Sequence, residues 1–196
     1  MAAELALFAC CGFFVFVIGV LVLFYIISIF NGLISLKNNI DKSWANIDVV
    51  LKQRNDLIPN LVETVKGYAK YEKGVLEEVT KLRTDMMSAE GPSAKAKIND
   101  AMTTGLKSLF AVAENYPQLQ ASQNFLKLQE QLAAMENQIA DRREFYNDSV
   151  LLYNTRIASV PDSVAASVLG MKQKEYFKAT EEEKKVISVN MDVEKK

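Results

Sequence analysis

Histidine is absent from this sequence of 196 residues, and cysteine occurs only twice, at the adjacent positions Cys10 and Cys11. The lack of an imidazole excludes catalysis and metal binding that depend on histidine. Two neighbouring cysteines inside an apolar stretch provide neither a thiolate cluster nor a disulfide framework. Because 23 Lys and Arg residues balance 24 Asp and Glu residues, the chain also lacks the basic character of a nucleic-acid-binding protein. We therefore expect no metal, no cofactor and no nucleic acid.

Glycine and proline are also scarce, with 8 and 4 residues respectively. The sequence is instead rich in Leu, Ala, Lys, Glu and Gln, which favour helices over sheets. The predicted fold class is all-α.

An apolar run dominates the N-terminal part of the chain, where the 26 residues from 5 to 30 include no charged side chain. A helix of that length measures roughly 39 Å, enough to cross the ~30 Å hydrocarbon core of a bilayer. A cleaved signal peptide would need a basic start, a shorter apolar core and a small-residue cleavage site. We therefore expect residues 1–30 to form a short external N-terminus and an uncleaved single-pass membrane anchor.

The charges around this run predict its orientation. Only Glu4 precedes it, whereas Lys37, Lys42, Lys52 and Arg54 follow it. Positively charged residues favour the cytoplasmic side, so the C-terminal bulk of the chain is predicted to lie in the cytoplasm.

An apolar stripe follows the run and advances by alternating steps of four and three residues. Fourteen positions keep this register, and they are Ile40, Trp44, Ile47, Leu51, Arg54, Ile58, Leu61, Val65, Tyr68, Glu72, Val75, Val79, Leu82 and Met86. A period of 3.5 residues is typical of coiled-coil-like packing. It predicts a rod over about residues 32–87 that follows the membrane helix without a break between them, and Pro59 could divide this rod into two helices.

Further helices are predicted over residues 94–115 and 122–160, after a turn at residues 88–93. Since the connections are short, antiparallel packing is the expected way to bury the apolar stripes. We predict an elongated antiparallel three- or four-helix bundle with long, kinked helices over residues 31–161, followed by a C-terminal extension over residues 162–196.

Pro59 lies inside the helical register, within a polar cluster. The cluster consists of Arg54, Asn55, Asp56, Pro59, Asn60 and Glu63. Proline removes one backbone hydrogen bond and crowds the carbonyl of Asn55, so a kink is expected there. The favoured interpretation is a kink whose freed groups are capped internally. The alternative is a polar interaction site at a hinge.

Three charged residues, Arg54, Glu72 and Arg142, occupy positions of the apolar stripes. A lone buried charge is too costly to persist, so each needs a partner or access to water. We expect Glu72 to pair with an arginine on a facing helix and to fix the register of the bundle. Catalysis by Glu72 is disfavoured, because no second acid, nucleophile or glycine-rich loop accompanies it.

The dipeptide Tyr-Asn occurs twice on one helix face, as Tyr146-Asn147 and Tyr153-Asn154. We expect the tyrosine rings to pack in the core, and asparagines at this spacing can form a ladder against a neighbouring helix. Ligand binding is the alternative.

The C-terminal tail alternates apolar and polar residues between positions 186 and 193, after a helical turn that begins at Thr180. The apolar positions are Ile187, Val189, Met191 and Val193. This pattern predicts a short strand that pairs with the tails of neighbouring subunits. A disordered polar end is the alternative.

Three stretches of this sequence resemble the LemA family. They are FNGLISLKNNIDKSWANIDVVLKQRNDLIPNLVETVKGYAKYE (30–72), AENYPQLQASQNFLKLQEQL (113–132) and EFYNDSVLLYNTRIASVP (144–161). The resemblance covers about residues 30–180 and implies a bacterial, membrane-anchored, antiparallel helical bundle with a short external N-terminus. It implies no enzymatic reaction, and one branch of similar proteins accompanies magnetosome membranes.

These features predict a non-catalytic scaffold that self-associates at the cytoplasmic face of the bacterial inner membrane and organises or remodels it. Its expected partners are the lipid bilayer and further copies of the same chain. The alternative is a signalling or adaptor protein that tethers a membrane-protein partner such as a protease.

Overall fold

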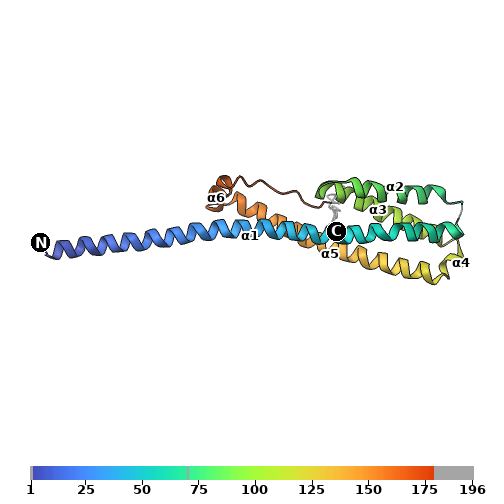
Figure 1. Cartoon of the computed structure of the whole chain (residues 1–196), viewed down its shortest axis with the longest axis horizontal. Coiled ribbons are helices and arrows are strands. Elements are labelled where there is room, and N and C mark those ends of the chain that lie inside the picture. Colours follow the sequence, from blue (N-terminus) through green and yellow to red (C-terminus); the bar gives the residue numbers. More distant parts are fainter. Residues whose placement is uncertain (1, 70, 179–196) are drawn as a thin grey trace, which may run out of the picture. The chain divides into compact units, whose positions relative to one another are not determined.

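The computed structural model of the chain describes residues 2–69 and 71–178. Within these residues every regular element is a helix, which confirms the predicted all-α fold class (Figure 1). The helices are α1 (Ala2–Tyr68), α2 (Lys73–Ser88), α3 (Pro92–Ala113), α4 (Pro117–Gln120), α5 (Gln123–Ala158) and α6 (Asp162–Val168). The predicted tail helix at Thr180 and the predicted strand at 186–193 lie outside the described residues.

The described residues form two compact units, and α1 and α5 each contribute to both. Unit 1 contains residues 2–42 and 148–174. Unit 2 contains the described residues from 43 to 147 together with residues 175–178.

In unit 1, α1 presents two kinds of surface. Nearly every side chain from residue 12 to residue 28 is exposed. Of the helices in the described part, only α1 is long and apolar enough to cross a membrane. Just 6% of the most apolar 18-residue stretch of α1 is buried. Next along the helix, Ile29 and Leu33 are buried against Ala165 and Ala166 of α6. The apolar run therefore leads directly into packed structure.

Unit 2 is an antiparallel bundle of α1, α2, α3 and α5. Its core combines apolar side chains of all four helices with Leu119 of α4. The contacts give the directions: Asn46 and Arg54 of α1 meet Arg142 and Glu136 of α5, so these two helices run in opposite directions.

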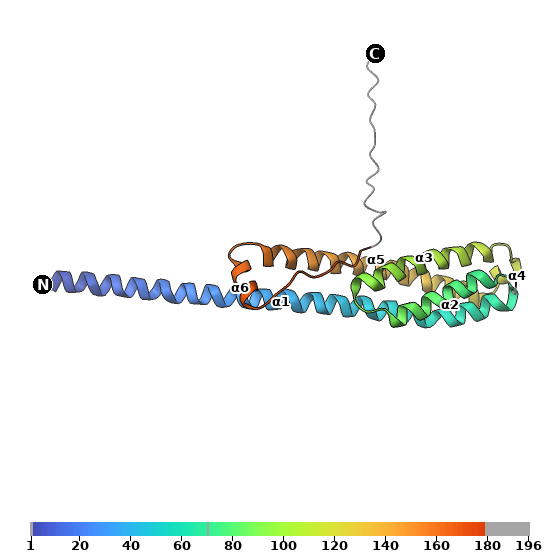
Figure 2. The ribbon, with the colours of Figure 1, turned by 90° about the horizontal axis from the view of Figure 1, so that it is seen from above.

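The predicted rod over residues 32–87 is wrong, because α1 ends at Tyr68 and α2 begins at Lys73. Arg83 of α2 bonds back to Asn55 of α1, so the two helices form an antiparallel hairpin (Figure 2). The apolar pattern of the sequence continues across the hairpin because α1 and α2 each bury one apolar stripe in the same core. Leu61 of α1 and Val79 of α2 both belong to this core. Pro59 lies inside α1 and does not divide it.

The turn before α3 confirms the break predicted at residues 88–93. Gly91 has a φ of +82°, a conformation that glycine adopts without steric cost, and Pro92 then opens α3. The later helix predictions also hold within two residues at each end, at Pro92–Ala113 and Gln123–Ala158.

Candidate functional site

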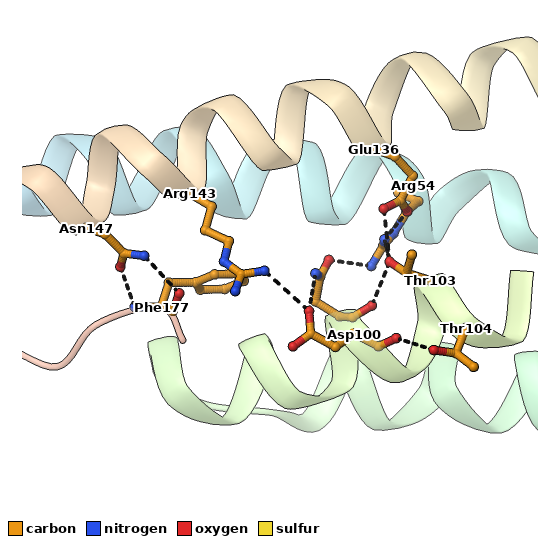
Figure 3. A network of polar contacts seen from close by, with 9 residues as sticks. Arg54, Asp100, Thr103, Thr104, Glu136, Arg143, Asn147 and Phe177 are labelled. Carbon is orange, nitrogen blue, oxygen red and sulfur yellow. Dashed lines mark hydrogen bonds and ion pairs between the residues drawn. The ribbon is translucent and has the colours of Figure 1, made fainter. Parts of the chain in front are cut away.

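A buried arginine lies at the centre of unit 2. Arg54 of α1 is only 2% exposed and forms an ion pair with Glu136 of α5. Its guanidinium also donates to Asn99 Oδ1 at 2.8 Å and to Thr103 Oγ1 at 3.4 Å, both on α3 (Figure 3). One charged side chain therefore fixes three helices in register, and each of its terminal nitrogens has a polar partner.

The polar network extends from Arg54 along α3 and α5. The Asn99 side chain donates to Asp100, and Asp100 pairs with Arg143 at 3.5 Å. The Arg143 guanidinium lies 5.9 Å from the centre of the Phe177 ring, within the range of a cation–π contact (Figure 3). Polar contacts thus link the core arginine to an extended segment, residues 171–178, which we call the strap.

In unit 2 the strap is held by its backbone. The Tyr146 hydroxyl donates to the carbonyl of Glu175 at 2.9 Å. The Asn147 side chain donates to the carbonyl of Phe177 at 3.1 Å and accepts from its N–H at 2.9 Å. The Phe177 ring is fully buried and lies 6.0 Å from the ring of Trp44. A side-chain amide here satisfies both backbone groups of one residue, as a neighbouring strand would.

The second Tyr-Asn pair holds the strap in unit 1 in the same way. The Tyr153 hydroxyl donates to the carbonyl of Lys172 at 3.2 Å. The Asn154 side chain donates to the carbonyl of Lys174 at 3.0 Å and accepts from its N–H at 2.9 Å. Burial, followed by the negative charge of Asp41, raises the pKa of Tyr153 above its usual value, so its hydroxyl remains a donor at neutral pH.

The two pairs use a common spacing. They lie seven residues apart on α5, and the backbone groups they bind lie three residues apart on the strap. The tyrosine rings are buried, as the sequence suggested, but the asparagines contact extended chain rather than a neighbouring helix.

The predicted polar cluster around Pro59 separates into buried and exposed parts. Arg54 and Asn55 are buried, whereas Asp56, Asn60 and Glu63 are exposed. The carbonyl of Asn55, which Pro59 deprives of its helical partner, accepts a hydrogen bond from Arg83 Nε at 3.3 Å. The buried Oδ1 atom of Asn55 has no hydrogen-bond partner among the described residues.

The other two predicted charges have different surroundings. Glu72 precedes α2 and accepts a hydrogen bond from the Tyr116 hydroxyl at 3.3 Å, so the structure gives it a tyrosine partner in place of the predicted arginine. Burial and then the Glu72 carboxylate raise the pKa of Tyr116. Arg142 is partly exposed and donates to the carbonyl of Asn46 at 3.0 Å.

The sequence of this chain matches the profile of the LemA family over residues 43–191. The chain belongs to the LemA family. It is 26% identical to magnetosome protein MamQ 2 of Paramagnetospirillum magneticum over 76% of its own length, and it covers 64% of that relative. It is 24% identical to MamQ of Magnetospirillum gryphiswaldense, again over 76% of this chain and 64% of the relative. It is 22% identical to protein LemA of Metamycoplasma hominis, over 88% of this chain and 78% of the relative. The chain thus spans less than two thirds of the MamQ sequences.

Several members of the site were not identified from this LemA-family sequence. Glu136, Asn99 and the pair Asp100–Arg143 are polar residues on helices whose faces became clear only in the packed bundle. The strap was missed because its hydrogen bonds come from the backbone. The one available signal was the aromatic pair Tyr176-Phe177 among charged residues. In residues 2–69 and 71–178 no group of three or more acidic or cysteine side chains is placed to hold a metal ion.

Proposed function

We propose that this LemA-family chain is a single-pass, non-catalytic membrane scaffold whose bundle lies in the cytoplasm of a bacterium. The main support is the apolar run of α1, whose residues 12–28 are exposed on nearly all sides although Ile29 packs in unit 1. Exposure of so much apolar surface to water is unfavourable in free energy, whereas its burial in the hydrocarbon core of a bilayer is favourable. The polar network also suits a structural role, because Arg54 donates three hydrogen bonds through its terminal nitrogens and contacts two other helices.

The orientation can be tested with single cysteines. In a chain with Cys10 and Cys11 replaced by serine, the variants Ala2→Cys and Lys97→Cys are each treated with a membrane-impermeant maleimide, in intact inner-membrane spheroplasts and after lysis. We expect labelling at position 2 in intact inner-membrane spheroplasts and at position 97 only after lysis. The reverse pattern would contradict the proposed orientation, and recovery of the chain in the soluble fraction would contradict the anchor.

Self-association is supported by apolar side chains that α5 leaves open. Leu151 and Leu152 are adjacent in unit 1 and both are exposed. We expect the full chain in mild detergent to have the mass of a defined homo-oligomer, and L151E/L152E to lower that mass. The matched control is Leu126→Glu, at another exposed leucine of α5. A monomeric mass for the unmodified chain would contradict the scaffold.

The C-terminal residues Ile187, Val189, Met191 and Val193 are a second proposed contact between subunits. Their alternation suits strand pairing between chains. Deletion of residues 186–196 tests this contact separately, since it leaves Leu151 and Leu152 intact. An unchanged oligomer mass would remove the tail from the proposal.

The second candidate function is an adaptor that tethers a membrane-protein partner. It is favoured by a hollow of about 250 Å³ in unit 2 that is lined by Asn55, Asp56, Lys52 and Lys95. A monomer that co-purifies in stoichiometric amount with one other membrane protein, and loses it on D56A, would support the adaptor over the scaffold.

The proposed role in organising or remodelling membrane follows the family branch to which the MamQ relatives belong, since these are named magnetosome proteins. Reconstitution into liposomes followed by electron microscopy tests it. We expect clustering or altered curvature of the vesicles with the full chain, and unchanged vesicles with L151E/L152E.

A further inference from the structure

Helix α6 and its preceding turn carry a row of exposed valines in unit 1. Val160, Val164 and Val168 are 86%, 67% and 73% exposed, respectively. Val164 and Val168 are four residues apart within α6, so they lie one helical turn from each other on one side, and Val160 lies in the turn that precedes the helix. We call these three residues the valine face.

The opposite side of α6 is packed on α1. Ala165 and Ala166 are buried against Ile29 and Leu33. Asp162, the only charged residue between positions 157 and 171, is 7% exposed and is paired with Arg156. The valine face is therefore bordered by no exposed charge from its own helix.

The contact with Ile29 fixes the depth of α6 if α1 crosses a membrane. Ile29 is the second-last residue of the apolar run over residues 5–30, which is ~39 Å long as a helix against a ~30 Å hydrocarbon core, and the first charged residue after it is Lys37. The end of that run therefore lies in the interfacial layer, and α6, which packs beside it, lies at the same depth (Figures 1 and 2).

Basic side chains lie beside this helix. A hollow of about 470 Å³ in unit 1 is lined by Lys37 of α1, by Leu169 and by Lys172 and Lys174 of the strap. Apolar residues next to lysines are the pattern of segments that lie in a membrane interface, where lipid phosphates attract the lysines.

We propose that α6 is a membrane-docking element whose valine face enters the interfacial layer of the same bilayer that α1 crosses. The occupant of this face is phospholipid. This inference rests on the proposed membrane anchor and adds a second, non-spanning contact on the bundle side. Two contacts that are rigidly joined through Ile29 and Ala165 restrict the tilt of α1, since interfacial anchors set the tilt of membrane helices.

The test places an environment-sensitive fluorophore on the full chain in liposomes. In a C10S/C11S background, Val164→Cys is labelled with nitrobenzoxadiazole and the chain is reconstituted in phosphatidylcholine and phosphatidylglycerol. The matched control is Val49→Cys, at an exposed valine of α1 in unit 2. We expect a blue-shifted emission at position 164 that is quenched by lipids carrying doxyl spin labels, and neither effect at position 49.

Flotation of the liposomes separates the possible failures. If the chain floats with the vesicles but the label at position 164 emits as in water, the docking element is wrong and the anchor stands. If the chain does not float, the anchor itself is wrong. If the label is shielded without quenching by the lipids, a second copy of the chain covers the valine face and the proposal is overturned.

A second variant tests the valines themselves. Because they are exposed, V160D/V164D/V168D should fold, which the helical circular dichroism signal of the chain checks. A label at Leu169→Cys should lose its blue shift and its quenching in this triple variant, and should keep both when only Val49 is changed to aspartate. Retention of both signals in the triple variant would contradict the proposal.

Discussion

The two units share the helices α1 and α5 but bury their apolar side chains to different extents. In unit 2, buried residues from α1, α2, α3 and α5 form one continuous core that includes Leu61 and Leu109. In unit 1, Ile29, Leu33, Ala165 and Ala166 form a small buried cluster, whereas nearly all of residues 12–28 of α1 are exposed. Unit 2 buries most of its apolar stripes in its own core, whereas the apolar run of unit 1 is exposed over nearly all of residues 12–28.

The difference shows that the arrangement of apolar residues, more than their number, indicates the environment of a helix. A stripe at steps of three and four predicts a protein neighbour, as between Ile40 and Val65, whose seam positions are mostly buried. Apolar residues on all sides of a helix predict lipid. In α1 the two patterns follow each other without a break.

The largest expected effect comes from charging the apolar run in unit 1. V17R/L21R places two arginines near the middle of the run, and each costs about 2.5–3.5 kcal/mol at the centre of a membrane helix. We expect most of the chain to leave the membrane pellet after alkaline carbonate extraction. The matched control, Leu126→Arg in unit 2, should remain in the membrane pellet. If both variants disappear from the pellet, the experiment has measured misfolding and not the loss of membrane insertion.

The next effect concerns the buried charge of unit 2. Arg54→Ala removes the ion-pair partner of Glu136, to which Thr103 still donates, and the donor to Asn99 Oδ1, at a cost of about 3 kcal/mol in the free energy of unfolding. Urea unfolding in mild detergent measures this loss. The double variant R54M/E136M should recover most of the stability, because it removes both charges and keeps apolar volume.

Arg142→Ala is the matched control, since Arg142 occupies a similar stripe position but is partly exposed. We expect a loss of less than about 1 kcal/mol from it, as for exposed charge pairs. Equal losses from Arg54→Ala and Arg142→Ala would contradict the central role of Arg54.

These arginines also show how much the sequence could predict. Burial of a charge at position 54 followed from the apolar register, and so did the need for a partner. The partner itself did not follow, since Glu136 lies 82 positions further along the chain and only the packed bundle brings it near. Helix ends near Gly91 and Pro92 were predictable because glycine and proline act locally.

The hairpin after Tyr68 and the strap were not predictable for a different reason. The hairpin leaves the heptad register intact, so periodicity alone cannot distinguish it from a continuous rod. The strap is recognised through its carbonyl and N–H groups, which every residue possesses. Asn147 and Asn154 were visible as a repeat, but the repeat carries no information about whether a helix or an extended chain lies opposite.

The two strap contacts provide a smaller, direct comparison between the units. Asn147→Ala leaves two backbone groups of the buried Phe177 unsatisfied, at a cost of about 1–3 kcal/mol. Asn154→Ala exposes the same groups of Lys174, which is partly exposed, so water replaces the lost bonds and the effect is smaller. Amide hydrogen exchange of residues 172–177 measures both, with the exposed Asn124→Ala as control. Equal protection in all three variants would contradict the contacts.

The smallest expected effect is a pH dependence in unit 1. Burial and Asp41 raise the pKa of Tyr153 above its ordinary value of about 10, so the folded state favours the neutral hydroxyl. The contribution of this group to stability is therefore complete below about pH 10 and is lost as the pH rises through the folded pKa.

At neutral pH, Tyr153→Phe loses the hydrogen bond to the carbonyl of Lys172, worth about 0.5–1.5 kcal/mol. The difference in unfolding free energy between the unmodified chain and Tyr153→Phe should hence narrow above pH 10, while Tyr71→Phe, at an exposed position, gives the baseline. A difference that stays constant up to pH 11 would contradict a raised pKa of Tyr153 in the folded state.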